Sequence, residues 1–160
     1  MLSSLLMAIP KSILDAKGLW HGKSLLNLSW LPPDKRVTES ASRFHVDTDA
    51  NHAFATITYD WHHEGKRHEG TILICKANKS KVVEMGWVDS WHQNGGVLHL
   101  VGEESESGVV KAKGTYEAEK QTWGWTIAFE RTSDQLVMTM ENVTPKGEAE
   151  WAVKATYKHG

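Results

Sequence analysis

Apolar and polar residues alternate with a period of two along most of this chain. From Val110 to Tyr116, small or aromatic residues occupy every second position, and lysines and a threonine lie between them. Successive side chains of a β-strand point to opposite faces, so this pattern is typical of an antiparallel strand with one buried face. The same alternation predicts about ten strands, near residues 20–30, 36–46, 52–62, 67–76, 81–92, 97–103, 110–116, 123–129, 135–141 and 150–157.

The connection between two of these strands contains a strong turn signal. Asn94-Gly95 is the residue pair preferred in the two-residue type I′ hairpin. A tight turn at this point continues the preceding strand to Trp91 and sets Asp89 opposite Leu100. We therefore expect the Asp89 side chain to lie on a buried face.

Chain length and strand order together predict the fold. A chain of 160 residues is expected to form one domain. Strands in up-and-down order leave two exposed edges unless the sheet closes on itself. We therefore expect an all-β domain, a closed antiparallel up-and-down barrel of about ten strands over residues 18–159.

The first part of the chain, residues 1–17, lacks this alternation. It is expected to form a short amphipathic helix that caps the barrel, and Gly18 is a typical residue just after a helix end. A secretory signal peptide is the alternative. It is disfavoured because no basic residues precede the apolar stretch and Pro10-Lys11 interrupts it.

The residues at the start of the first strand carry a resemblance to known proteins. Gly18-Leu19-Trp20-His21-Gly22 resembles the Gly-x-Trp motif that opens the barrel in the calycin superfamily, which includes lipocalins, fatty-acid-binding proteins and nitrobindins. In lipocalins this Trp closes the base of the barrel and stacks against an Arg from a late strand. The resemblance implies a calycin-like barrel in which Arg131 contacts Trp20.

An ordered series of short motifs extends the resemblance over nearly the whole chain. The motifs are Tyr59-Asp60-Trp61, Glu69-Gly70, Trp87-Val88-Asp89-Ser90, Gly114-Thr115-Tyr116, Trp123-Gly124-Trp125 and Gly147-Glu148. They are similar to those of an uncharacterised bacterial family of calycin-like barrels, domain of unknown function 1579, whose members have no agreed activity. This resemblance implies a fold and a pocket but no reaction.

Aromatic side chains gather on the strand faces that we expect to point into the barrel. Such a lumen has room for one small ligand or for side chains alone, and an indole combines a large apolar surface with one N–H donor. The alternative is that these rings simply fill the core. We expect ligand contacts from Tyr59, Trp87, Asp89, Tyr116, Trp125 and Arg131, with Arg131 nearer the closed end, and, as a second group, from Glu39, Arg43, Trp61 and Trp91.

A carboxylate inside a barrel needs a partner, because an unpaired buried charge is costly. We therefore expect Asp89 to pair with Arg131, with Arg43 or with a donor on the ligand. The inward side of the strand that contains Arg43 is left open by the pattern. Phe44 and Val46 alternate with Arg43 and favour the side opposite to it.

These features support one leading function and several alternatives. We expect reversible binding of a small, largely apolar or amphipathic molecule with one polar end inside the barrel. The first alternative is an enzyme of the isomerase or lyase type that uses Glu39, Asp89 and Tyr116 for acid–base chemistry. A second is a haem-binding barrel like the nitrobindins, with His159 as the candidate ligand, although Ser24 replaces the last Gly of the usual nitrobindin motif. A third is a filled barrel with a structural or interaction role.

Composition and charge exclude several other classes. Lys and Arg total 18 against 20 Asp and Glu, a net charge of −2, so we expect no nucleic-acid partner. No apolar run approaches the roughly 20 residues that span a membrane. A single cysteine, Cys75, excludes an intrachain disulfide and a Cys-based zinc site, and the nine His lack a metal-binding spacing, so we expect no metal and no cofactor. Residence in the cytoplasm is the default expectation, and a homodimer is left open.

Overall fold

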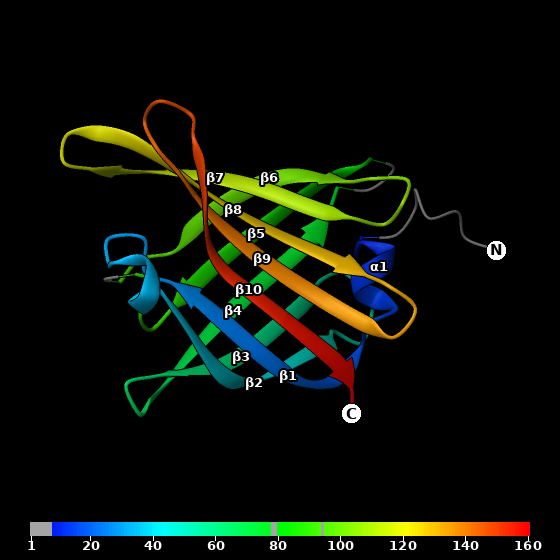
Figure 1. Cartoon of the computed structure of the whole chain (residues 1–160). Helices are drawn as coiled ribbons and strands as arrows, with labels where there is room; N and C mark the ends of the chain where they lie inside the picture. Colours follow the sequence, from blue (N-terminus) through cyan, green and yellow to red (C-terminus); the bar gives the residue numbers. More distant parts are fainter. Residues whose placement is uncertain (1–7, 78–79, 94) are drawn as a thin grey trace.

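Ten antiparallel strands close into a barrel, and the predicted fold class is confirmed. The computed structural model describes residues 8–77, 80–93 and 95–160. Figure 1 shows the strands wrapping around one axis, with the short helix α1 at one end. The elements are α1 (Lys11–Leu14), β1 (Gly18–Asn27), the 3₁₀ turn η2 (Pro33–Lys35), β2 (Val37–Thr48), β3 (Ala55–His63), β4 (Lys66–Lys76), β5 (Val82–Asp89), β6 (Leu98–Glu104), β7 (Val110–Ala118), β8 (Gln121–Arg131), β9 (Gln135–Val143) and β10 (Ala149–His159).

Each strand pairs with its neighbours in the sequence, and β1 also pairs with β10. This closing pair runs from Trp20 opposite His159 to Leu26 opposite Val153. Closure removes the unpaired strand edges that an open sheet exposes. Because the order is up-and-down, the odd-numbered strands all begin at the end of the barrel that carries α1. We call the other end, formed by the connections after β1, β3, β5, β7 and β9, the open end.

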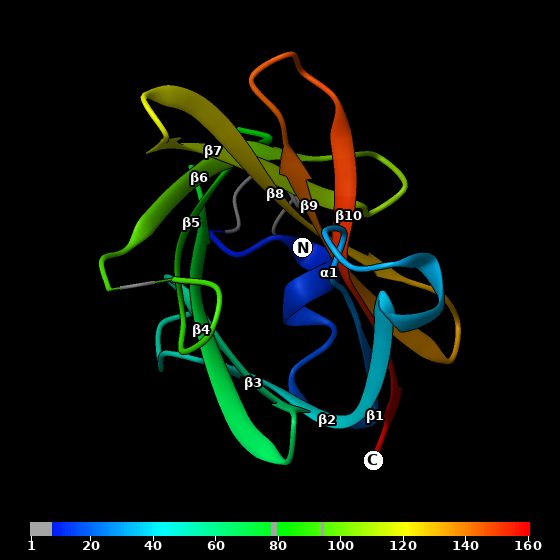
Figure 2. The ribbon, with the colours of Figure 1, turned by 60° about the vertical axis from the view of Figure 1, so that its left-hand side comes forward.

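The helix that caps one end is shorter than the sequence predicts. α1 covers four residues, whereas the predicted cap spans 1–17, of which 1–7 lie outside the described residues. After the helix, Ala16 and Lys17 donate to the carbonyls three residues before them, and the carbonyl of Ala16 accepts the indole N–H of Trp20 at 2.8 Å. Ile13 of the helix is fully buried, and Figure 2 shows α1 inside the ring of strands. Helix and indole together close this end.

Arg131, at the end of β8, lies against this closed end. Its guanidinium carbon is 5.5 Å from the centre of the Trp20 ring, and Nη1 donates to the carbonyl of Asp15 at 2.6 Å. The contact that the calycin resemblance implies for Arg131 and Trp20 is therefore present. The cation also lies beside the last carbonyls of α1, where positive charge is favourable.

We expect Arg131→Ala to destabilise the protein by about 1 kcal/mol, since it removes one exposed cation–π contact and one hydrogen bond to a carbonyl. Chemical denaturation followed by Trp fluorescence measures the change. Lys158→Ala, on the outer face of β10, is the matched control and should change stability by less than about 0.5 kcal/mol. Equal effects of the two substitutions would show that Arg131 does not help to close the barrel.

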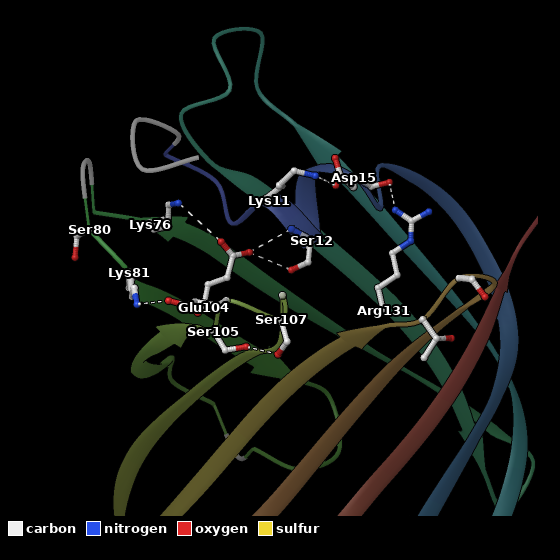
Figure 3. A pocket seen from close by; sticks show the side chains of 14 residues that line it. Lys11, Ser12, Asp15, Lys76, Ser80, Lys81, Glu104, Ser105, Ser107 and Arg131 are labelled. Carbon is white, nitrogen blue, oxygen red and sulfur yellow. Dashed lines mark hydrogen bonds and ion pairs between the residues drawn. The ribbon is translucent and has the colours of Figure 1, made fainter. Parts of the chain in front are cut away.

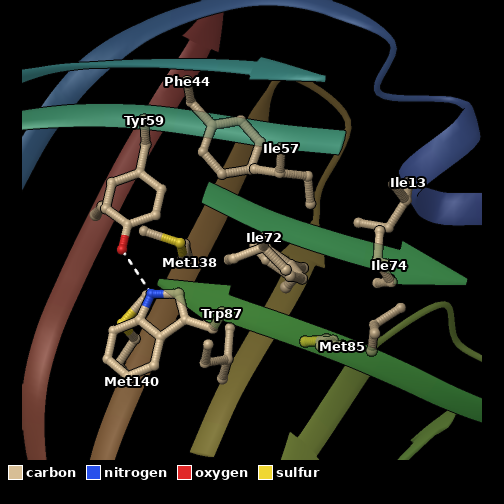
Figure 4. Packing of buried hydrophobic residues seen from close by; sticks show 14 of the residues in the cluster. Ile13, Phe44, Ile57, Tyr59, Ile72, Ile74, Met85, Trp87, Met138 and Met140 are labelled. Carbon is tan, nitrogen blue, oxygen red and sulfur yellow. Dashed lines mark hydrogen bonds between the residues drawn. The ribbon is translucent and has the colours of Figure 1, made fainter. Parts of the chain in front are cut away.

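Apolar side chains fill the interior from α1 to about the middle of the strands. Figure 4 shows β3, β4, β5 and β9 contributing to one packed cluster. Packing of this density leaves no ligand-sized space, so room for a small molecule must be sought nearer the open end. The large side chains that are fully buried in this core include Phe44, Ile57, Ile72, Ile74, Met85, Leu100, Phe129 and Tyr157.

The connection between β5 and β6 differs from the tight turn that the sequence predicts. β5 ends at Asp89, and Leu100 lies opposite Met85 instead of Asp89. The cause is the Asp89 side chain. Its Oδ1 accepts hydrogen bonds from the backbone N–H groups of Trp91, at 2.8 Å, and His92, at 2.9 Å. These bonds turn the chain out of the sheet. Asn94 of the predicted turn lies outside the described residues.

Candidate functional site

A hollow lies at the open end of the barrel, where β5 and β7 end and β6 and β8 begin. Its volume is about 430 Å³, which falls in the usual range for small-molecule sites. Rings and aliphatic groups form much of its wall, and an imidazole and an amide add polar atoms. The lining residues are Trp87, His92, Gln93, Gly95, Leu98, Tyr116, Glu117, Ala118 and Trp125. We call this feature the mouth hollow.

Two stacked indoles separate the mouth hollow from the core. The ring centroids of Trp87 and Trp125 are 5.1 Å apart, and the ring planes differ by 9°. The two side chains are 2% and 7% exposed. They come from β5 and β8, which β6 and β7 separate in the barrel. Gly114, the β7 residue opposite Trp125, adds no side chain to this layer. A flat apolar ligand in the hollow would therefore meet an aromatic surface.

A hydrogen-bonded network lies beneath this layer. The indole N–H of Trp87 donates to the hydroxyl of Tyr59 at 2.9 Å (Figure 4), and that hydroxyl donates to Oδ2 of Asp89 at 2.6 Å. Oδ1 of Asp89 accepts the backbone N–H groups of Trp91 and His92. The carboxylate is thus fully surrounded by donors inside the barrel, which satisfies its charge without an arginine.

The arginine partners predicted for Asp89 lie elsewhere. Arg131 is at the closed end, as described above, and Arg43 points outward from β2, where its Nη2 lies 2.8 Å from Oδ2 of Asp60. Arg43 faces outward because Phe44, its neighbour, is fully buried in the core. The predicted pairing of Asp89 with either arginine is therefore wrong. The Tyr59 hydroxyl and the backbone N–H groups of Trp91 and His92 already donate to the carboxylate.

The electrostatics of the network keep Asp89 charged and Tyr59 neutral. Burial acts to raise the pKa of Asp89, but the close approach of His92 and the hydrogen bond from Tyr59 outweigh it and lower the pKa to about 2. Burial and the neighbouring carboxylate raise the pKa of Tyr59 well above its usual value. At neutral pH the pair therefore consists of a carboxylate and a phenol that donates to it.

His92 is the functional candidate that the sequence reasoning missed. Its side chain is 8% exposed, and its Nδ1 lies 3.1 Å from Oδ1 of Asp89. Neither ring nitrogen has a hydrogen-bond partner among the described residues. The signal that could have revealed it is the Asp89-x-x-His92 spacing, which places a histidine beside a carboxylate once the chain turns. Four indoles surround the imidazole, those of Trp61, Trp87, Trp91 and Trp125, at centroid distances of 4.8 to 6.0 Å.

A small internal cavity lies on the core side of His92. Its volume is about 10 Å³, which is close to the space that one water molecule needs. Polar lining comes from Ser24, Asp89 and His92. Among the described residues the lumen is therefore nearly filled at this level, and the mouth hollow above it offers far more room for a ligand.

The remaining predicted site residues divide between the hollow, the layer beneath it and the outer surface. Tyr116 lines the hollow, and its hydroxyl donates to Oδ1 of Asn142 at 2.5 Å. Trp61 is buried beneath and lines the small cavity. Trp91 is half-buried, but it lies in the β5–β6 connection and not on a strand. Glu39 is exposed and faces Lys23, so its predicted inward position is wrong.

A larger hollow at the closed end has a different character. Its volume is about 720 Å³, and charged groups and serines line it (Figure 3). The buried ammonium of Lys76 lies 3.8 Å from Glu104, and Glu104 accepts hydrogen bonds from the backbone and hydroxyl of Ser12. These contacts tie α1 to β4 and β6. This surface suits structural ion pairs better than an apolar ligand.

Within residues 8–77, 80–93 and 95–160, no group of three or more His, Cys, Asp or Glu side chains is placed to hold a metal ion. Over those ranges no helix is both long and apolar enough to cross a bilayer.

Comparison with known proteins supports the fold and goes no further. No protein-family model matches the chain, and no curated protein matches it either. The crystal structure of Rv2717c from M. tuberculosis superposes with a TM-score of 0.64 over 95% of this chain and 99% of that one, at 15% sequence identity. At that identity the likeness shows a shared barrel architecture.

Proposed function

We propose that this barrel reversibly binds a small, largely apolar molecule with one polar end, in the mouth hollow. The observation that carries the proposal is the aromatic wall of the hollow, formed by the stacked Trp87 and Trp125 together with Tyr116 and Leu98. An apolar ligand ring would bury surface against these side chains, which favours binding by roughly 25 cal/mol for each Å² removed from water. His92 and Gln93 give the hollow a polar side that would orient the ligand.

The expected ligand is small because the lumen below the indole layer is packed. It is amphipathic because the hollow combines rings with an imidazole, and the rim carries Glu117. The proposal includes membership of the calycin superfamily, supported by the barrel topology and by the contact between Arg131 and Trp20.

Filling the hollow tests this function directly. Ala118 lies on the lining of the hollow near the end of β7, and Ala118→Phe places a ring in the space that a ligand would occupy. We expect this variant to lose at least about tenfold in affinity for whichever member of a panel of small apolar acids, amines and phenols binds the wild type. Its melting temperature should change by less than about 2 °C, because the site is partly open to solvent.

The matched control is Thr115→Phe, which adds the same ring to the exposed outer face of the same strand. It should leave the affinity unchanged. Quenching of Trp fluorescence reports binding, since Trp87 and Trp125 flank the hollow. The proposed site is wrong if no panel member binds, or if Ala118→Phe and Thr115→Phe bind equally well.

Two of the three alternative functions, the enzyme and the haem-binding barrel, find less support. The acid–base group of an enzyme would need Glu39 near Asp89 and Tyr116, yet Glu39 lies on the outer surface beside Lys23. Haem would need a histidine whose free nitrogen faces a space large enough for the macrocycle. His159 instead is exposed and packs edge-on against Trp20 at the closed end, and it lines neither the mouth hollow nor the small cavity. The residues present therefore do not fit haem in that position.

A further inference from the structure

The buried imidazole of His92 has a ring nitrogen that no hydrogen bond within the described residues satisfies. Buried polar atoms are nearly always hydrogen-bonded, and those that are not call for an explanation. Nε2 of His92 is shielded from solvent and lacks a partner among the described residues, while Nδ1 lies beside the Asp89 carboxylate at 3.1 Å. Yet the ring borders the mouth hollow on one side and the small cavity on the other. An imidazole in this position has unused capacity to bind a ligand.

Asp89 determines what kind of partner the imidazole can take. The carboxylate oxygen lies 3.1 Å from Nδ1 of His92, and a carboxylate favours the tautomer that carries its proton on the nearer nitrogen. Nε2, on the far side of the ring from Asp89, is then a lone-pair acceptor. The ligand group that pairs with Nε2 must therefore donate a hydrogen bond.

A second polar group without a partner belongs to another residue that lines the hollow. The indole N–H of Trp125 is buried and has no acceptor in the described part of the chain, and the Trp125 ring lies 5.3 Å from the His92 ring, centroid to centroid. An indole N–H can only donate. One donor and one acceptor that lie close together match a hydroxyl group, which can accept from the indole and donate to the imidazole at the same time.

We propose that the polar end of the ligand is a weakly acidic hydroxyl, as in a phenol or an enol, which donates to Nε2 of His92 and accepts from Nε1 of Trp125. The proposal rests on the proposed function and names the ligand class for the same hollow. His92 acts as a proton acceptor. The proton moves from the ligand oxygen to Nε2, leaving an oxyanion on the ligand and an imidazolium between that oxyanion and Asp89.

The surroundings favour this charge arrangement. Proton transfer conserves the total charge of ligand, His92 and Asp89, and it places the imidazolium between two anions. The rings of Trp61, Trp91 and Trp125 lie 4.8 to 5.5 Å from the imidazole, centroid to centroid, within the distance at which an aromatic face attracts a cation.

Several other titratable groups lie near enough to contribute. Tyr59 is held as a donor to Asp89, and Tyr116 is held as a donor to Asn142. Glu117 lies on the rim of the hollow. His68 lies behind Trp61, and burial lowers its pKa, so it is neutral near pH 7. The negative charges of Asp89, beside the imidazole, and of Glu117, at the rim, oppose an oxyanion in the hollow, and the imidazolium offsets them.

A pair of probes of nearly equal shape tests the inference. 4-Nitrophenol can donate a proton and becomes a coloured phenolate when ionised, whereas 4-nitroanisole carries a methyl group in place of that proton. We expect the protein to bind 4-nitrophenol at least about tenfold more tightly than 4-nitroanisole by calorimetry. We also expect the ionisation constant of the bound phenol, followed by absorbance as a function of pH, to rise at least about tenfold over its value in solution.

The variant His92→Gln assigns these effects to the imidazole. Glutamine keeps a hydrogen-bonding group in the hollow but cannot take up a proton, so 4-nitrophenol should still bind while its ionisation constant returns to the solution value. Thr115→Ala, on the exposed outer face of β7 and away from the hollow, is the matched control and should leave the ionisation of the bound phenol shifted.

The outcomes separate the two proposals. Binding of both probes with equal affinity and no change in ionisation would overturn the assignment of the hydroxyl and leave the proposed hollow intact. A shifted ionisation that persists in His92→Gln would overturn the role of His92. If neither probe binds, the inference falls, and the broader panel together with Ala118→Phe decides whether the proposed function falls with it. The comparison of the two probes on the wild type stands even if His92→Gln fails to fold.

Discussion

Asp89→Asn is expected to destabilise the folded barrel by about 3 kcal/mol, even though the two side chains have almost the same shape. The carboxylate receives the Tyr59 hydroxyl and two backbone N–H groups and has His92 beside it, and its side chain is fully buried. An Asn amide can accept only at one atom, so its NH₂ group would confront a donor. Removing one member of a buried charged network typically costs about 3–5 kcal/mol, and leaving a buried donor unmatched costs about 1–3 kcal/mol.

The pH dependence of this effect provides a second and independent measurement. The pKa of Asp89 falls from 3.8 to about 2 on folding, so the folded state binds the proton more weakly than the unfolded state does. The resulting stabilisation, about 2 kcal/mol, is fully present above pH 4 and is lost as the pH falls towards 2. We therefore expect the stability difference between wild type and Asp89→Asn to shrink over that window.

The comparison of wild type and variant is needed because the pKa of Asp60 is also lowered in the folded protein. Burial acts to raise the pKa of Asp60, but hydrogen bonds from Arg43 and Arg67 lower it overall. Its contribution is common to wild type and variant and cancels in the difference. Asp134→Asn, in an exposed loop, is the neutral control and should change stability by less than about 0.5 kcal/mol. A loss below about 1 kcal/mol for Asp89→Asn at pH 7 would contradict the role given to the network.

The strand faces could be predicted from the sequence because burial imposes a period of two. Trp87, Trp125 and Tyr59 are inward as their parity indicates, and the alternation from Val110 to Gly114 places those residues in the core or against it. The contact at the closed end could also be predicted, since Arg131 does contact Trp20. In each case a local pattern coincides with the global requirement to bury one face of the sheet.

The polar partners of the site could not be predicted in the same way. Parity says which face a side chain occupies but not where a strand ends, and β5 ends because Asp89 captures the following backbone N–H groups. The predicted hairpin extended the strand past this point, so His92 was never placed inside the barrel. Arg43 was misplaced for a different reason, since a charged residue on a strand gives no sign of whether Asp60 on the neighbouring strand will satisfy it outside.

Gly114→Leu is expected to be the most damaging change on the wall of the barrel, with a loss of about 3 kcal/mol or more. Gly114 is buried on the inward face of β7, consistent with its parity. A Cβ atom there would lie 2.5 Å from the carbonyl oxygen of His99 and 3.2 Å from Cγ of Leu98. The first contact is with the backbone of His99, which is paired with Gly86 of β5, so rotating a side chain cannot relieve it and the backbone itself must shift.

The close contact at Gly114 gives a different reason for the expected loss of stability from the one that the sequence suggests. The run of small residues on β7 suggests a wall that leaves space for a ligand, but the glycine instead allows β6 to approach closely as the sheet curves. Gly114→Ala should therefore already be destabilising, by about 1–3 kcal/mol, because the Cβ alone meets the carbonyl. The loss of stability should be larger for Gly114→Leu than for Gly114→Ala, because the longer side chain overlaps more with Leu98.

Lys113→Leu provides the matched control, because Lys113 is exposed on the same strand and a surface substitution usually stays within about 0.5 kcal/mol. Denaturant unfolding of the three variants, read by Trp fluorescence, gives the comparison. Because Leu98 also lines the mouth hollow, any folded Gly114→Ala protein should show weakened ligand binding as well as lower stability. Equal destabilisation by Gly114→Leu and Lys113→Leu would mean that β6 can move away from β7, and the close approach at Gly114 would then not be what fixes the wall beside Leu98.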